Sequence, residues 1–273
     1  EGSITADRIA VIARNRYVFS HLEQELSSRN IPFFFKKNST GIENESEYMR
    51  VFDLAIRILI NKKDYIHLSQ LMKIIGSSET IELSEMSGMS ILQEVLMHTA
   101  YENMLPALEC LEKETLNFGN ALSLFDTLLP DFDDDERYLI SMDIQQWRKH
   151  WNKYCMHVPK ENRTLTSFRN QISLGKTRDI EVNSGISLLT AHMSKGLQFD
   201  VVFIMGLCEG TFPDYRAVKG GNTELSQEMN NMYVAVTRAK RLCYMTYPTK
   251  KRMPWGDIKS QVPSRYIRDI VAL

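Results

Sequence analysis

The alternation of apolar and polar positions predicts an α/β layer at the start of the chain. Residues 8–13 form a short apolar run suited to a buried strand, and residues 17–29 repeat apolar positions at helical spacing. A second strand is predicted at residues 31–35, which are rich in Phe. From residue 47 to residue 155 the apolar positions recur every three to four residues with little strand signal, which indicates a block of helices.

Strand character returns in the last third of the chain. Residues 186–190 and 200–207 are predicted strands, and the second is a nearly continuous apolar run typical of parallel strands buried on both faces. A helix over residues 224–240, a strand over residues 242–247 and a last helix over residues 263–273 complete the pattern. Strands at both ends with helices between them predict one discontinuous α/β domain with an insertion.

Composition narrows the class of protein. The chain has 273 residues, of which 43% are hydrophobic, and its 33 Lys and Arg nearly balance 34 Asp and Glu, so any nucleic-acid site must be local. The four cysteines form no CxxC pair, and no apolar run approaches the roughly 20 residues of a membrane span. We therefore expect a cytoplasmic protein with no membrane partner. Because the first residue is Glu, we also expect a piece of a longer polypeptide.

One short motif resembles a phosphate-binding loop but fails its spacing. Gly175, Lys176 and Thr177 match the end of a P-loop, yet Asn170 stands where that loop needs a further glycine. The preceding residues 165–174 predict a helix instead of the strand that feeds such a loop. With no P-loop and no carboxylate pair for Mg²⁺, the chain alone is not expected to hydrolyse ATP, and no metal ligands are predicted.

Two other clusters have structural explanations. The acidic residues 131–136 precede a helical pattern, where carboxylates stabilise the helix N-terminus, and they lack the spacing of a calcium-binding loop. Trp147, His150 and Trp151 could stack on bases, but their helical spacing favours core packing.

A polar loop follows the predicted strand 186–190. It carries Thr190, His192, Ser194 and Lys195 at the carboxyl end of a buried strand, where open α/β sheets bind ligands. Hydroxyl and imidazole groups and the exposed amides near Gly196 can all contact phosphate oxygens, so a nucleic-acid backbone is one candidate ligand. On chemistry alone, an ordinary exposed loop explains the same residues equally well.

A second candidate lies near the end of the helix predicted at residues 224–240. Arg238 follows Thr237 there, and a guanidinium held near a helix end can neutralise charge on a transferring phosphoryl group. The ordinary alternative is a surface arginine. Tyr233, Val234 and Val236 are predicted to lie in the core.

Together these two stretches resemble motifs V and VI of superfamily 1 helicases of the UvrD/Rep type. The family patterns are close to T-x-H-x-x-K-G-L-E-F and Y-V-A-x-T-R-A. The opening segment, residues 8–35, more weakly resembles the start of the second motor domain of these helicases. The matching residues are Thr190, His192, Lys195, Gly196, Leu197, Gln198, Phe199, Glu209, Gly210, Phe212, Pro213 and Tyr233 to Ala239.

The resemblance implies a RecA-like, P-loop-NTPase-type parallel sheet with an inserted all-α subdomain. The motor domain would comprise residues 1–75 and 179–273, and the insertion residues 76–178. The function implied is the C-terminal portion of an ATP-dependent DNA helicase, in which ATP and Mg²⁺ are bound together with an N-terminal RecA-like domain of the same polypeptide. Movement along single-stranded DNA would run 3′ to 5′. Duplex junctions, and repair proteins bound through the insertion, are further partners implied.

The resemblance also assigns roles to six residues. Arg238 would be catalytic and face the γ-phosphate. Gly196 and Gln198 would lie by the nucleotide. The residues placed on DNA are Thr190, His192 and Arg14.

The sequence departs from the family pattern at three positions. Gln198 replaces a Glu whose carboxylate accepts a hydrogen bond from the ribose, and a charged acceptor binds more strongly than a neutral one. Met229 and Asn230 replace two arginines. These changes leave open a helicase-like scaffold with decayed ATPase activity. The helicase part of an AddA/RecB-like helicase-nuclease is another alternative.

Overall fold

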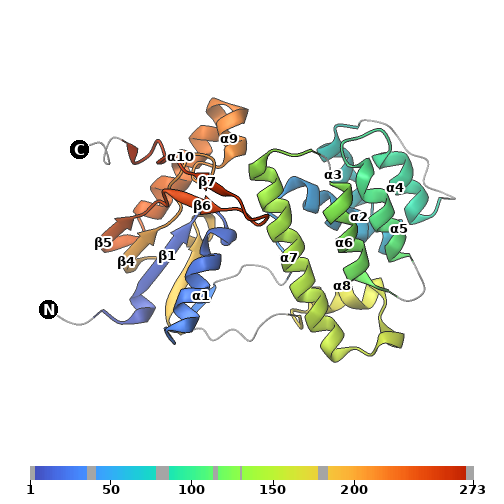
Figure 1. Ribbon diagram of the computed structural model, residues 1–273, viewed down its shortest axis with the longest axis horizontal. Helices are drawn as coiled ribbons and strands as arrows, with labels where there is room; N and C mark the ends of the chain where they lie inside the picture. The colour runs from blue at the N-terminus through green and yellow to red at the C-terminus, as the bar shows by residue number, and fades with distance from the viewer. Residues whose placement is uncertain are drawn as a thin grey trace. The chain divides into compact units, whose positions relative to one another are not determined.

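The computed structural model describes residues 4–35, 41–77, 86–112, 116–129, 131–177 and 184–268. The chain divides into two compact units (Figure 1). One unit comprises residues 1–38 and 180–273, and the other comprises residues 39–179.

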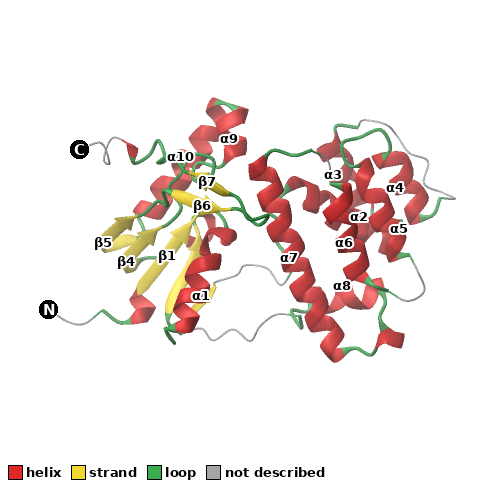
Figure 2. Ribbon diagram, in the orientation of Figure 1, coloured by secondary structure: helices red, strands yellow, loops and turns green. Residues whose placement is uncertain are grey.

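The first unit is built on a five-stranded sheet in which every pairing is parallel. The strand order is β2-β3-β1-β4-β5, and Figure 2 draws the strands in yellow. This topology confirms the predicted α/β class with a RecA-like parallel sheet. The strands are β1 (Ile9–Ala13), β2 (Phe33–Phe35), β3 (Ile186–Thr190), β4 (Phe199–Ile204) and β5 (Ala239–Met245).

Helices cover the two faces of this sheet. On one face, Met232 and Ala235 of α10 (Asn222–Val236) pack against β1, β3 and β4. On the other face, α1 (Ser20–Ser28) contributes Leu26 to a smaller core. The central strands β1, β3 and β4 are largely apolar because both of their faces are covered, whereas the edge strand β5 is mostly exposed. The remaining elements of the unit are η1 (Ala6–Arg8), η2 (Arg16–Phe19), η5 (His192–Ser194), α9 (Tyr215–Gly220) and the hairpin of β6 (Lys250–Arg252) and β7 (Ile258–Ser260).

Among its described residues the second unit contains helices joined by loops, and no strand. Its core is aromatic: Phe118 stacks on Trp147 with ring centroids 5.3 Å apart, and Phe52 and Phe168 pack around this pair. Such pairs add to the free energy gained from burial. The helices are α2 (Glu47–Ile60), α3 (Tyr65–Ile75), α4 (Gly88–Leu96), α5 (Leu105–Leu111), α6 (Phe118–Leu128), α7 (Asp134–His157) and α8 (Leu165–Ser173), with η3 (Glu102–Met104) and η4 (Lys160–Asn162).

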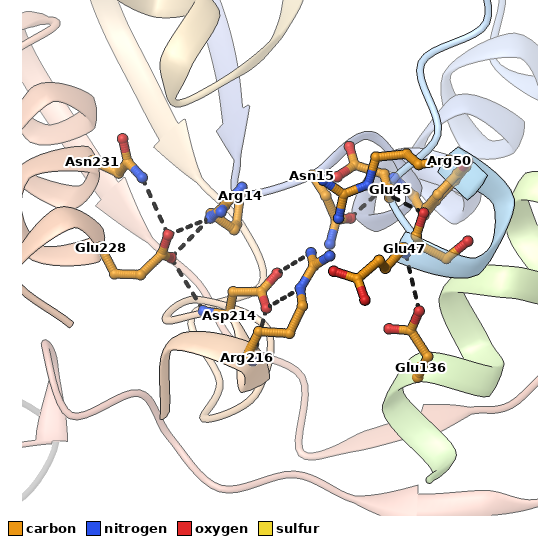
Figure 3. A network of polar contacts seen from close by, with 12 residues as sticks. Arg14, Asn15, Glu45, Glu47, Arg50, Glu136, Asp214, Arg216, Glu228 and Asn231 are labelled. Carbon is orange, nitrogen blue, oxygen red and sulfur yellow. Dashed lines mark hydrogen bonds and ion pairs between the residues drawn. The ribbon is translucent and has the colours of Figure 1, made fainter. Parts of the chain in front are cut away.

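Buried carboxylates of α7 cap the start of α2. The Asp143 carboxylate accepts hydrogen bonds from the backbone N–H groups of Glu45 and Ser46 and from the Ser46 hydroxyl. The Glu136 carboxylate, labelled in Figure 3, accepts a hydrogen bond from the backbone N–H of Glu47 at 3.1 Å. Four otherwise unpaired donors at a helix N-terminus are thereby satisfied.

The helical unit begins earlier in the chain than the insertion expected from the sequence. The sequence placed residues 47–75 with the α/β domain, but the division into compact units places them in the helical one. The reason is packing: the apolar faces of α2 and α3, including Phe52 and Leu71, belong to the same core as Trp147.

The P-loop-like motif, the acidic run and the tryptophan cluster have structural roles in the fold. Gly175 adopts φ +69° just after α8, and Asp133 caps α7 by accepting from the N–H of Glu136. Trp147 and Trp151 are buried, as predicted. Tyr233 was predicted to be buried and is 70% exposed, because it lies on the solvent side of α10. The helix predicted at residues 263–273 falls partly outside the described residues.

Candidate nucleotide and nucleic-acid site

The candidate residues lie at two edges of the sheet: Arg14, Thr190 and His192 follow the carboxyl ends of β1 and β3, whereas Gly196, Gln198 and Arg238 precede the amino ends of β4 and β5. Ala13, the last residue of β1, pairs in register with Thr190, the last residue of β3. Arg14 therefore leaves the sheet beside the loop that carries His192. Open α/β sheets bind ligands at the carboxyl edge, because the loops there surround the ends of the strands.

The loop after β3 is held in a tight turn. The hydroxyl oxygen of Thr190 accepts from the N–H of Met193 at 3.4 Å, and the buried Ser194 hydroxyl donates to the carbonyl of Ala191 at 2.8 Å. The His192 and Lys195 side chains remain exposed. The turn thus presents an imidazole and an ammonium group to solvent, a combination that can contact phosphate oxygens.

Gly196 and Gln198 continue this loop and are exposed. Gly196 has φ +82°, in the region that favours glycine, and a Cβ added there would meet nothing within 4 Å. The glycine is therefore required by the backbone turn and not by crowding. Its open surroundings leave room for a ligand.

Arg238 joins the second motif to this loop. Its Nη1 donates to the carbonyl oxygen of Leu197 at 3.0 Å, while Nε donates to that of Val234 at 2.8 Å. A third bond runs from Nη2 to the Thr237 hydroxyl at 2.9 Å. The two segments are also joined through their backbones, since the N–H of Phe199 donates to the carbonyl oxygen of Arg238 at 2.9 Å. The guanidinium thus lies against the segment that contains the predicted nucleotide-binding residues.

A buried carboxylate lies beside Arg14 (Figure 3). The Glu228 side chain on α10 accepts from Arg14 Nε at 2.8 Å with each of its oxygens. It also accepts from the backbone N–H of Asp214 at 3.1 Å and from Asn231 Nδ2 at 3.2 Å. Glu228 is 3% exposed, so these donors offset the cost of burying its charge.

Asp214 extends the charged cluster toward α9. Its carboxylate accepts from Arg216 Nε and Nη2, each at 2.9 Å. Burial acts to raise the pKa of Asp214, but the hydrogen bonds and charge of Arg216, with a smaller contribution from Arg14, lower that pKa below its usual range. Asp214 is therefore ionised at neutral pH.

The structure brings most of the predicted residues together. Thr190, His192, Gly196 and Gln198 share one loop, which Arg238 contacts directly. Arg14 lies at the carboxyl edge with Thr190 and His192, opposite the edge where Arg238 meets Leu197, and its Nε is bound to Glu228. Sequence reasoning missed Glu228, Asp214 and Arg216, because Arg14 lies 214 positions from Glu228 and an Asp and an Arg two residues apart form no recognisable motif.

The described residues contain neither a metal-binding cluster nor a membrane-spanning helix. No cluster of three or more His, Cys, Asp or Glu side chains there is arranged to hold a metal ion. In the same part of the chain, no helix combines the length and the apolar character needed to cross a membrane.

The fold and the site define a RecA-like motor domain with an inserted helical subdomain. Residues 143–250 match the family described as the UvrD-like helicase C-terminal domain. The resemblance to the C-terminal region of UvrD/Rep-type superfamily 1 helicases is therefore confirmed.

Curated relatives agree with this family. The chain is 28% identical over 245 residues to the ATP-dependent DNA helicase PcrA of Staphylococcus aureus (strain MRSA252), covering 85% of this chain and 30% of the relative. It is 32% identical over 202 residues to the protein of the same name from Staphylococcus epidermidis (strain RP62A), covering 73% of this chain and 24% of the relative. The chain thus spans about a quarter to a third of the length of these relatives.

Proposed function

We propose that this chain is the C-terminal portion of an ATP-dependent DNA helicase. It supplies part of a composite ATP site and part of a track for single-stranded DNA. The observation that carries the proposal is the contact of Arg238 with Leu197, because it joins the two motifs and places Arg238 beside the loop of Gly196 and Gln198, before the amino ends of β5 and β4.

In this proposal Arg238 acts as an arginine finger. Its Nη1 and Nη2 groups are held by a carbonyl and a hydroxyl oxygen, and both bonds can be exchanged for phosphate oxygens while Nε stays on Val234. Bound ATP and Mg²⁺ supply the phosphoryl group and the charge that offsets its oxygens. The exposed Gly196 and Gln198 flank the nucleotide.

The DNA contacts belong to the turn after β3 and to Arg14. Thr190 and His192 hold the phosphate backbone, which requires no positive field over the whole chain. Movement from 3′ to 5′ is part of the proposal and rests on the resemblance alone.

The proposal extends to the longer protein. An N-terminal RecA-like domain of the same polypeptide binds the remainder of ATP and Mg²⁺, so this chain alone is inactive. The further ligands are single-stranded DNA and duplex junctions, with repair proteins bound through the helical unit. The proposed location is the cytoplasm. In this proposal the sheet-bearing unit is the second motor domain, and the helical unit is the inserted subdomain.

Substitution of Arg238 in the full-length protein tests the finger role. Arg238→Ala is expected to abolish ATP-driven unwinding and leave DNA binding largely intact, because the guanidinium acts on the phosphoryl group. Arg241→Ala, which removes an exposed arginine three residues away on β5, is the matched control. Unwinding at near the wild-type rate by Arg238→Ala would remove Arg238 from this role.

A second candidate is a helicase-like scaffold without ATP turnover. Met229 and Asn230 are exposed on α10 where the family pattern has arginines, and Gln198 removes a charged acceptor. DNA-stimulated ATPase activity of the full-length protein separates the two. Its absence, with partner binding retained, would favour the scaffold.

A further inference from the structure

We propose that Glu228 is a positioning residue that orients Arg14 toward a phosphate group at the carboxyl edge of the sheet. The inference rests on the proposed function, because it deepens the role given there to Arg14. It concerns a buried carboxylate that touches no ligand itself and acts through the arginine.

The first support is the way in which Glu228 holds Arg14. Both carboxylate oxygens accept from the same donor, Nε, at 2.8 Å (Figure 3). A carboxylate that serves only as an ion-pair partner usually engages two guanidinium nitrogens side by side. Here the bond to Nε fixes the stem of the side chain. Within the part of the chain that the structure describes, neither Nη1 nor Nη2 of Arg14 donates a hydrogen bond.

The second support is the rigidity of the carboxylate. Glu228 is held from two further sides by the Asp214 backbone and by Asn231, and it is 3% exposed. A side chain locked in this way can fix the direction of its partner. The Arg14 side chain is 27% exposed, so its outer amino groups remain open to an anion.

The third support is a comparison inside the same sheet. Asp200, also 3% exposed, pairs with Arg8 through Nη2, at 3.0 and 2.8 Å to its two oxygens. That pair lies at the amino ends of β1 and β4, at the opposite edge of the sheet from Arg14. Two buried carboxylates thus hold arginines at the two ends of β1, and of these two only Glu228, at the carboxyl edge, binds through Nε.

The isosteric variant Glu228→Gln tests the inference in the full-length protein. A glutamine that keeps an acceptor for the Asp214 N–H turns its NH₂ group toward both Arg14 Nε and Asn231 Nδ2, so Arg14 loses one of its two acceptors and the charge that holds it. Two probes are titrated, a fluorescent oligo-dT strand and a fluorescent ATP analogue. Affinity for one of them is expected to fall about ten- to a hundredfold, the scale that misplacing a binding group produces. The probe affected identifies whose phosphate Arg14 meets.

Asp200→Asn is the matched control, because it neutralises an equally buried carboxylate. It is expected to lower thermal stability and leave both affinities within twofold of wild type. In an Arg14→Ala background, Glu228→Gln should cause no additional loss, since residues that act through one another are not additive. Equal effects of Glu228→Gln and Asp200→Asn on binding, or a loss that persists without Arg14, would overturn the inference.

Arg14→Lys keeps the test decisive if Glu228→Gln does not fold. The lysine ammonium can pair with Glu228 and has no outer amino groups to offer a phosphate. Wild-type stability with affinity reduced as in Arg14→Ala supports the inference, whereas wild-type affinity contradicts it. Failure of the proposed function would give a different result. The wild-type protein would then bind one of the probes but show no DNA-stimulated ATPase activity.

Discussion

The Ser46 hydroxyl donates a hydrogen bond to Asp143 Oδ2 at 2.6 Å, between residues that lie 97 positions apart in the sequence. Asp143 is fully buried, and it also accepts from the backbone N–H groups of Glu45 and Ser46. One carboxylate on α7 therefore fixes the first turn of α2 and closes the helical unit at the place where the chain enters it.

Asp143→Ala is expected to destabilise the helical unit by about 3 kcal/mol, because it leaves several buried donors without an acceptor. Denaturant unfolding followed by tryptophan fluorescence measures the change, since Trp147 and Trp151 lie in this core. Asp126→Ala, which removes an exposed partner of Arg148, is the control and should cost less than about 1 kcal/mol. Equal losses would show that Asp143 contributes no more than a surface ion pair.

Substitution of Thr190 and His192 is expected to weaken binding of single-stranded DNA. Anisotropy across a salt series measures it: affinity should fall with salt in the wild type, and the Thr190→Ala/His192→Ala variant should bind more weakly at every salt concentration. The control Thr5→Ala/His157→Ala removes the same two side-chain types at exposed positions, one before β1 and one in the helical unit. Unchanged binding by the first variant would leave the turn without a role on DNA.

Gln198→Glu is expected to tighten nucleotide binding about two- to fivefold. The reason is that a carboxylate is the stronger hydrogen-bond acceptor for a ribose hydroxyl, and a net hydrogen bond contributes about 1 kcal/mol. The KM for ATP of the full-length protein measures the effect. Gln227→Glu adds the same charge at an exposed position of α10 and should leave the KM unchanged. A KM that rises or does not move in Gln198→Glu contradicts the assignment.

Glu209 is expected to make the α/β unit sensitive to acid. Burial acts to raise its pKa, but the hydrogen bonds and charge of Arg265 lower that pKa below the ordinary value of 4.5. A carboxyl group with a lowered folded pKa stabilises the protein fully above its unfolded pKa, and this contribution is lost as the pH falls through the folded value.

The Tm of wild type and of Glu209→Gln, followed from pH 7 to pH 3, measures this contribution. The wild-type advantage should be constant above about pH 5 and should shrink below the ordinary pKa of 4.5. A parallel titration of Glu25→Gln, which removes an exposed partner of Arg29, is the comparison. A Tm difference that stays constant down to pH 3 would contradict the assignment to the Glu209 carboxylate.

The sequence predicted the strands of the sheet well because their signal is local. The apolar runs at residues 186–190 and 200–207 correspond to β3 and β4, and helical spacing over residues 47–61 corresponds to α2. The same periodicity did not show which core α2 joins. Its apolar face packs on helices that follow much later in the chain, so the boundary of the insertion was placed too late.

The polar half of the site was harder to predict. On α10 the buried stripe is Glu228, Met232 and Ala235, at spacings of four and three residues. A stripe that begins with a carboxylate does not read as apolar, so Tyr233 was assigned to the core instead. The partner that makes Glu228 acceptable there, Arg14, lies 214 positions away. A contact of that separation leaves no periodic trace in the sequence.

The position of the helical unit between β2 and β3 has a topological consequence. Phe33 of β2 pairs in parallel with Ile186 of β3, and parallel neighbours cannot be joined by a hairpin turn. The whole helical unit therefore serves as the crossover connection of one β-x-β element. A shortened protein that omits residues 39–179 must replace them with a crossover of about a dozen residues or more, because a tight loop would reverse β3 and break the sheet.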